Sequence, residues 1–357
     1  MESLDEVLGY TLESLNEYNN QSLHKIVNIL IDNGIATKKE DEKEKSIFIG
    51  KMTDKVGLSY CLSKDNSVIK SIERWEFDKN YKYSAFFDLA NFDKDILAQL
   101  ILDKNVVAYD RDGECEELFS IAKVPSLIVQ EDVIYLKFNF KLDATDAFGE
   151  KLKKRYSILA IIYTKHNLLE LRFESLKNTF SNQRFRYVYD ILSWIRRYLN
   201  LSIYPMDLNK IVEYIKENGK KDKVVLSGQD MLMATGGKAT VEVGNSDETV
   251  LPFIGELKLL MQKYSNEFDK VPELKQIFDE FIYEKENLSE FPWVKFRFED
   301  PVFEVKFTFD YGKEHECQLQ HFHSPLKSNQ GRERMDYVTQ YIIKVRDIIA
   351  GLPAEQE

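Results

Sequence analysis

The chain has 357 residues, of which 43% are apolar and 13% are aromatic, and this composition supplies a packed core and excludes wholesale disorder. Its formal net charge of -11 argues against general coating of nucleic acid or of an anionic membrane, although it leaves room for a local basic patch. The length suits two or three domains.

The cysteines and the N-terminal residues favour a cytoplasmic protein. Cys61, Cys115 and Cys317 are far apart and form no CxxC pair, so a disulfide framework or a zinc ribbon is not expected. Residues 1–6 are acidic and lack the charge pattern of a signal peptide. No apolar run approaches the roughly 18 residues that a membrane helix needs. We therefore expect a cytoplasmic location, no membrane partner and no cofactor.

Residues 1–120 are expected to form an N-terminal α+β region. Apolar side chains recur at helical spacing over 3–18 and 21–33, and the second helix is expected to end at Asn33-Gly34. A charged loop and a short strand at 46–49 follow. An ordinary α+β region explains this order better than a winged helix does.

The remainder of this region carries strand and helix signals. Residues 56–88 alternate in polarity and contain many aromatic side chains, which predicts further strands. Residues 93–103 have the apolar spacing of a helix, and residues 110–114 have the composition of a turn.

Residues 121–220 are expected to contain a first βββα unit. Residues 135–142 alternate in polarity, which predicts a half-buried strand with a polar outer face. Residues 156–164 are apolar on both faces, as in a central strand, and residues 168–174 alternate again, with their charged residues on the outer face. Two helices are expected after these strands, over 187–199 and 207–218.

Residues 221–357 are expected to repeat this unit. A hairpin near Gly236-Gly237 and two helices near 254–264 and 272–285 should lead into it. The strand patterns at 295–309 and 315–324 and the helix after them then follow the order of the first unit, roughly 150 residues later, which suggests an internal duplication.

The fold class expected from these patterns is α+β. Two pseudo-repeated βββα units would form a mainly antiparallel sheet that is covered by helices on one side and polar on the other. We expect the two three-stranded sheets to join edge to edge, because free edges invite aggregation.

Two short patterns are candidates for metal-dependent or catalytic chemistry. His321 and His323 lie two residues apart on a predicted strand, and imidazole is a ligand for zinc or copper. Asp300, Glu304 and Lys306 resemble a nuclease arrangement of carboxylates and a lysine. Simple outward alternation on a solvated strand explains both patterns better, because such short patterns recur by chance. A phosphate-binding glycine loop is not supported by the spacing around Gly236.

Arginine clusters are the candidate with the best support for binding. Arg-x-Arg pairs recur before or at the start of the last helix of each unit, where backbone N–H groups also favour anions, and the arginine side chain can bond two phosphate oxygens at once. The candidate nucleic-acid-binding residues are Arg184, Arg186, Arg196, Arg197, Arg332 and Arg334.

These patterns favour a non-enzymatic sensor or adaptor that binds a macromolecular partner, with nucleic acid as the first partner to test and protein as the second. A metal-dependent nuclease or another hydrolase is one alternative. A structural subunit of a larger protein complex is the other.

Overall fold

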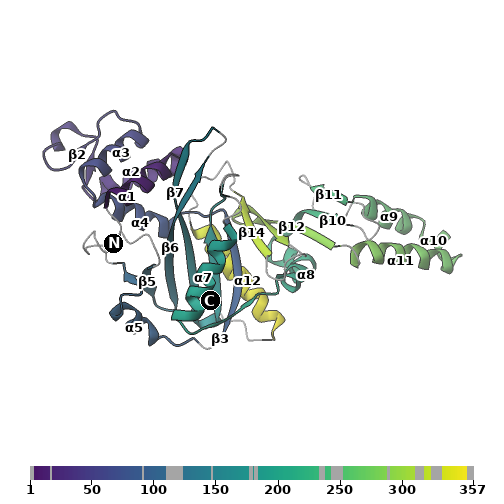
Figure 1. Ribbon diagram of the computed structural model, residues 1–357. Coiled ribbons are helices and arrows are strands. Elements are labelled where there is room, and N and C mark those ends of the chain that lie inside the picture. Colours follow the sequence, from purple (N-terminus) through teal and green to yellow (C-terminus); the bar gives the residue numbers. More distant parts are fainter. Residues whose placement is uncertain are drawn as a thin grey trace. The chain divides into compact units, whose positions relative to one another are not determined.

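The computed structural model describes residues 4–16, 18–90, 92–109, 124–145, 148–176, 180, 184–232, 238–242, 252–287, 290–309, 317–322 and 332–351. The chain forms two compact units. Unit 1 comprises Met1–Tyr81 and Phe86–Tyr204, and unit 2 comprises Lys82–Ala85 and Pro205–Glu357. The fold is α+β with mainly antiparallel strands, as the sequence predicts (Figure 1).

Unit 1 begins with a small helical layer. It contains α1 (Leu4–Leu15), α2 (Asn20–Asp32), α3 (Asp54–Lys64) and α4 (Val68–Asp78), and the two-residue strands β1 (Ala36–Thr37) and β2 (Ile47–Phe48) pair in parallel between α2 and α3. Apolar side chains of all four helices share one core cluster. The first two helices and the strand near residue 47 confirm the predictions.

The strands predicted over 56–88 are wrong for most of that range, because α3 and α4 occupy residues 54–78. Leu58 and Leu62 are buried at i, i+4 spacing in α3, and Ile69 and Ile72 are buried at i, i+3 spacing in α4. This is the apolar period of a helix, and interleaved aromatic residues imitate the alternation of a strand.

The sheet of unit 1 follows the order β3-β8-β7-β6-β5-β4, with β9 paired to β3. The predicted central strand is β7, which is buried on both faces over its second half. The strands are β3 (Tyr83–Ala90), β4 (Val107–Ala108), β5 (Ser126–Gln130), β6 (Val133–Thr145), β7 (Lys151–Tyr163), β8 (Leu168–Phe173) and β9 (Ser202–Pro205), and the helices among them are α5 (Ile96–Leu102) and α7 (Arg184–Tyr198).

Helices cover both faces of this sheet, which corrects the expectation of helices on one side. On one face, Trp194 of α7 packs edge-on against Phe138 of β6, with 5.3 Å between the ring centroids. On the other face, the Tyr10 hydroxyl of α1 donates a 2.7 Å hydrogen bond to the Asp143 carboxylate of β6. Side chains of α4 bond to β6 on that same face.

The sheet of unit 2 follows the order β11-β10-β12-β13-β14-β3. Strands β10 and β11 form the predicted hairpin, whose connecting residues 233–237 lie outside the described residues. The strands are β10 (Val224–Leu232), β11 (Lys238–Glu242), β12 (Glu290–Glu299), β13 (Val302–Phe309) and β14 (Cys317–Phe322), and the helices are α8 (Leu208–Asn218), α9 (Pro252–Lys263), α10 (Ser265–Phe268), α11 (Pro272–Asn287) and α12 (Glu333–Ile349).

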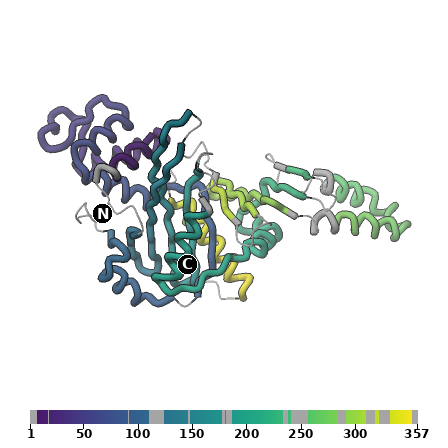
Figure 2. Tube along the Cα trace, viewed as in Figure 1, coloured from purple at the N-terminus to yellow at the C-terminus, as the bar shows by residue number. Residues whose placement is uncertain are grey.

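Helix α12 covers the apolar face of the unit 2 sheet. Phe298 of β12 packs against Tyr337 and Tyr341 of α12, with ring centroids 5.9 Å and 5.5 Å apart. The opposite face carries the partly exposed side chains of Lys295 and Arg297, as the outward alternation predicts. Between β11 and β12 the chain runs through α9, α10 and α11 as a helical hairpin (Figure 2).

The two βββα units have the same order of elements. Each is an antiparallel meander of three strands, β6-β7-β8 or β12-β13-β14, followed by a helix, α7 or α12. The duplication itself stays a prediction. The expected edge-to-edge junction of the two sheets stays a prediction as well.

Candidate nucleic-acid interface

The histidine pair does not form a described metal site. His321 lies opposite Val305 on the apolar face, is only 2% exposed, and its Nε2 lies 2.8 Å from the Ser84 hydroxyl. Its expected outward position on the polar face is therefore wrong, and His323 lies outside the described residues. Among the residues that the structure describes, no group of three or more His, Cys, Asp or Glu side chains could hold a metal ion.

The nuclease-like residues are placed separately. The Asp300 carboxylate lies in an exposed turn, 3.3 Å from the Lys223 ammonium. The Glu304 carboxylate is 3.2 Å from Arg297 and 3.6 Å from Lys295, so cations already neutralise it.

Lys306, the third member of that group, shares the polar face with Glu304. Its Nζ sits 4.1 Å above the centre of the Trp293 ring. These contacts pair each charged group with a neighbour on its own sheet or turn, and none of them directs two carboxylates at one point.

A buried ionic cluster in unit 1 is the feature that sequence reasoning missed. Glu73 and Glu76 of α4 bond to Lys137 of β6 and Arg155 of β7, and each of the four residues is at most 6% exposed. The Lys137 ammonium donates to Glu73 and, at 2.8 Å, to Glu76. The Arg155 guanidinium donates to the same two carboxylates. Two negative and two positive charges therefore balance inside the unit.

The surroundings of the cluster shift its pKa values in defined directions. Burial opposes the ionisation of Glu76, but Lys137, Lys79 and hydrogen bonds from Lys137 and Tyr18 outweigh it and lower the pKa of Glu76. Burial lowers the pKa of Lys137, and it lowers that of Arg155 to about 10. Burial, followed by the charge of Glu76, raises the pKa of Tyr18 well above its usual value.

A second ion pair is buried on β8. The Arg172 guanidinium donates to both oxygens of Glu170, at 2.7 Å and 2.8 Å, and the Tyr163 hydroxyl donates to the same carboxylate at 3.1 Å. Glu170, Arg172 and Lys137 were all predicted on a polar outer face. They are buried, so that prediction is wrong for unit 1.

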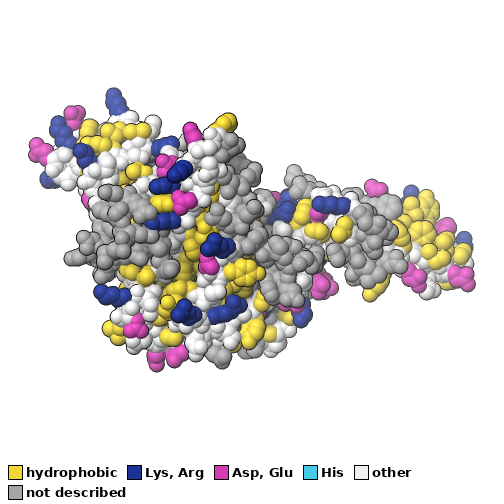
Figure 3. Space-filling model, viewed as in Figure 1, with side chains coloured by type: hydrophobic (Ala, Val, Ile, Leu, Met, Phe, Trp, Pro, Cys, Tyr) yellow, Lys and Arg dark blue, Asp and Glu magenta, His cyan; other side chains and the backbone are white. Residues whose placement is uncertain are grey.

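The arginines of α7 form an exposed basic face. Arg184 begins the helix, and its side chain lies outside what the structure describes. Arg186, Arg196 and Arg197 are exposed, as is Tyr189. At about 100° per residue, these four side chains fall within roughly a third of the helix circumference. Figure 3 shows Lys and Arg side chains over this helix, with Asp or Glu side chains among them, and the exposed Asp190 lies one turn after Arg186.

Local contacts hold two of these arginines without neutralising them. Arg196 donates a long, 3.4 Å hydrogen bond to the Ile203 carbonyl, and the Arg197 guanidinium lies 5.6 Å from the centre of the Tyr198 ring. Both partners are uncharged. We define the α7 face as Arg186, Tyr189, Arg196 and Arg197.

The second Arg-x-Arg pair is in a different setting. Arg332 precedes α12, and its guanidinium lies 3.0 Å from the Asp336 carboxylate. Arg334 is only 4% exposed, and burial lowers its pKa to about 10. Arg334 therefore contributes to packing, and among the candidate arginines whose side chains the structure describes, the exposed ones are Arg186, Arg196 and Arg197.

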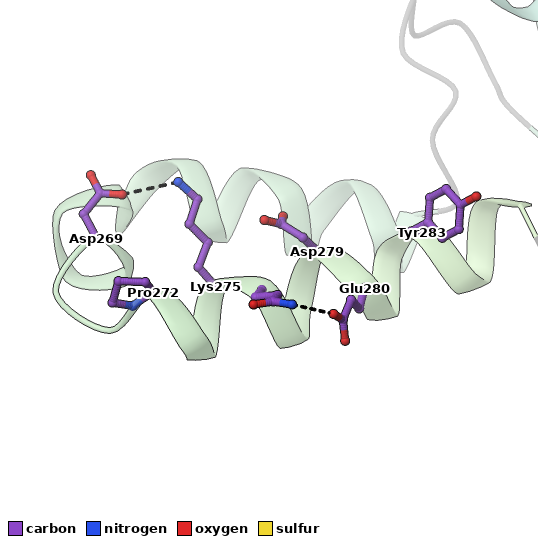
Figure 4. Close-up of a pocket in the computed structure, with 7 residues that line it drawn as sticks. Asp269, Pro272, Lys275, Asp279, Glu280 and Tyr283 are labelled. Carbon is purple, nitrogen blue, oxygen red and sulfur yellow. Dashed lines mark hydrogen bonds and ion pairs between the residues drawn. The ribbon is translucent and has the colours of Figure 1, made fainter.

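Two surface hollows are lined by residues that the structure describes. One lies on α11 and the turn before it, where an Asp269–Lys275 ion pair of 3.3 Å and a Gln276–Glu280 hydrogen bond of 2.8 Å occupy the lining side chains (Figure 4). Another in unit 1 lies among α2, α4 and β5 and is lined by residues of both charge signs, including Lys70 and Asp32.

Comparison with known proteins does not assign a function to this chain. No protein-family model matches the chain, and no curated protein sequence matches it significantly. Within the described residues, no helix has the length and apolar character to cross a membrane.

Proposed function

We propose that this protein is a non-enzymatic binding protein and that the α7 face contacts the phosphate backbone of a nucleic acid. The observation that supports the proposal is the exposure of Arg186, Arg196 and Arg197 on the same side of one helix. Arginine presents five N–H donors in a planar fork, which matches the oxygens of a phosphate group.

The dimensions and composition of the α7 face suit an extended backbone. Eleven residues separate Arg186 from Arg197, which corresponds to about 16 Å along a helix axis, and roughly five phosphates of one duplex strand lie within that length. Tyr189 is 55% exposed in the middle of the face and offers a ring on which a base can stack. Contacts of this kind position a protein on nucleic acid with little preference for sequence.

Charge reversal on the α7 face tests this function. We expect the double variant Arg186→Glu/Arg197→Glu to lose most of its affinity for a labelled duplex or single strand at low salt. On duplex DNA, losing two phosphate contacts should also reduce the slope of log affinity against log salt by about 1.8, because each contact releases roughly 0.9 counterion.

A matched control separates this effect from net charge. Lys51 and Lys55 are exposed in the helical layer of unit 1, and Lys51→Glu/Lys55→Glu makes the same change in net charge away from α7. Equal losses in the two double variants would refute the α7 face. If the wild-type protein binds neither duplex nor single strand at low salt, the nucleic-acid proposal fails, and an acidic protein partner becomes the hypothesis to test.

A further inference from the structure

The hairpin formed by α9, α10 and α11, residues 252–287, exposes several of its large apolar side chains; we call it the helical arm. On α9, Leu257 and Met261 pack with Met231 of β10 and Ile282 of α11. Leu260 lies on the same helix and is 48% exposed, and Tyr264, which directly follows α9, is 43% exposed. The apolar stripe of α9 is therefore only half covered.

Helix α11 repeats this pattern. Phe278 packs edge-on against Phe268 of α10, with ring centroids 5.5 Å apart, and Ile282 joins the small core at the base of the arm. Leu274, Ile277 and Phe281 follow at i, i+3, i+7 spacing and are between 37% and 60% exposed. At about 100° per residue they form a second stripe beside the buried one.

The two exposed stripes lie on the same side of the helical arm. In each helix the exposed stripe is rotated from the packed one by roughly 60–80° in the same sense about the helix direction. The helices run in opposite directions side by side (Figures 1 and 2), so equal rotations bring both stripes to one face. Figure 3 shows hydrophobic side chains gathered towards the α10 end of the arm.

The area of this face fits an interface between two copies. Its five exposed apolar residues are Leu260, Tyr264, Leu274, Ile277 and Phe281. With roughly 200 Å² for a large apolar residue, their exposed fractions amount to about 460 Å². A standard interface buries about 800 Å² per partner, of which roughly 65%, or about 520 Å², is apolar in homodimers.

The charges that flank the face favour a second copy over a partner of one charge sign. By helical phase, Lys263 lies along its rim together with Glu256, Glu273 and Glu280. Lys270 lies in the turn between α10 and α11. An anionic membrane or nucleic acid would meet the three carboxylates. A second arm carries both signs, so its lysines can approach the glutamates of the first.

We propose that the helical arm is a homodimerisation element: two copies of the chain pack their exposed α9 and α11 stripes together, which completes a four-helix bundle. Helical hairpins bury such stripes in bundles of this kind. The proposal is independent of the α7 face, which lies in unit 1.

Sedimentation velocity of the full chain tests the proposal. At about 100 µM, which detects even a weak interface of this size, we expect the wild type to sediment at twice the 41.9 kDa chain mass. Ile277→Asp places a carboxylate in the centre of the interface, so we expect it to weaken dimerisation at least about tenfold. Because Ile277 is 60% exposed in one copy, the variant should retain the wild-type circular dichroism spectrum.

Leu259→Asp is the matched control. Leu259 is also 60% exposed, but it lies about 100° around α9 from Leu260, outside the exposed stripe, so we expect this variant to remain a dimer. A monomeric wild type at the same concentration would overturn the proposal. A dimer that tolerates Ile277→Asp, or is weakened equally by Leu259→Asp, would overturn it as well.

Discussion

Removal of Lys137 from the buried ionic cluster should destabilise unit 1 strongly. Lys137→Met keeps most of the side-chain volume. Within the cluster, it leaves Arg155 as the cation that still bonds to Glu73 and Glu76. The Lys137 ammonium bonds to both carboxylates, and its side chain is fully buried. Two buried carboxylates would then carry one uncompensated negative charge.

The magnitude follows from what one unpaired buried charge costs. Breaking a buried ion pair by removing one partner typically costs about 3–5 kcal/mol, and we expect a loss in that range. A protein domain has a total stability of roughly 5–15 kcal/mol, so the variant should lose about a fifth of it or more. Adding Glu76→Gln restores the charge balance. The loss of unfolding free energy in the double variant should therefore be at least about 1 kcal/mol smaller than the summed losses of the two single variants.

Urea unfolding followed by tryptophan fluorescence measures this effect. Trp75 and Trp194 belong to unit 1 and Trp293 to unit 2, so a Trp293→Phe background makes the signal report on unit 1. Lys55→Met, at an exposed position, controls for the loss of a lysine. A loss below about 1 kcal/mol for Lys137→Met, or strictly additive effects in the double variant, would refute the role of the cluster.

Two further predictions concern unit 1. Leu192 of α7 is buried, so Leu192→Ala should lower the free energy of unfolding by about 2–5 kcal/mol in the same assay. Ser193→Ala, at the neighbouring exposed position, should lower it little. Equal losses in the two variants would show that α7 does not pack in the core. The raised pKa of Tyr18 means that its stabilising effect is complete below the ordinary tyrosine pKa of about 10 and declines as the pH rises above it. Tyr18→Phe should therefore lower stability at neutral pH, because the 3.0 Å hydrogen bond to Glu76 is lost, but should show a shallower decline between about pH 9 and 11 than the wild type. Tyr189→Phe, at an exposed position, should follow the wild-type curve, and identical slopes for all three proteins would contradict the prediction.

Apolar periodicity predicts the elements of this fold well where one period dominates. The helices at the N-terminus, the capped helix α8 and the meander strands follow from spacing alone, and Asp207 caps α8 through a 3.2 Å hydrogen bond from the Asn209 N–H. Periodicity fails over residues 54–78. There Glu73, Trp75, Glu76 and Phe77 are all buried in α4, so polarity does not mark the buried face, and tertiary packing selects the helix.

Alternation predicts which face of a strand a residue lies on, but not whether that face is exposed. Lys137 and Glu170 are on the polar face as predicted, and helix α4 then brings Glu73 and Glu76 over Lys137. The sequence does contain complementary charges that could indicate this cluster. Basic residues on adjacent strands and an i, i+3 pair of glutamates on a helix can neutralise one another, but only tertiary structure shows that they meet.

Helical phase explains why the two Arg-x-Arg pairs differ. One residue step leads from Arg186 to Tyr187, but three lead from Arg334 to Tyr337. Two additional residues rotate the side chain by about 200°. Arg334 therefore falls in line with the buried Val338 and Val345, whereas Arg186 faces solvent. An alignment with small gaps matches residue types, but it does not preserve the helical phase that decides which side chains are buried.

The division of β3 between the units has a consequence for biosynthesis. Tyr83 and Ser84 belong to unit 2 and pair with Gln320 and Leu319, yet His321, the partner of Ser84, follows 237 residues later. At roughly 5–20 residues per second, a ribosome needs about 10–50 s to deliver that partner. During this interval the first residues of β3 expose unsatisfied backbone groups that could pair with another nascent chain. A fragment that starts at residue 205 would lack these residues altogether, and one that ends at residue 204 would present them permanently.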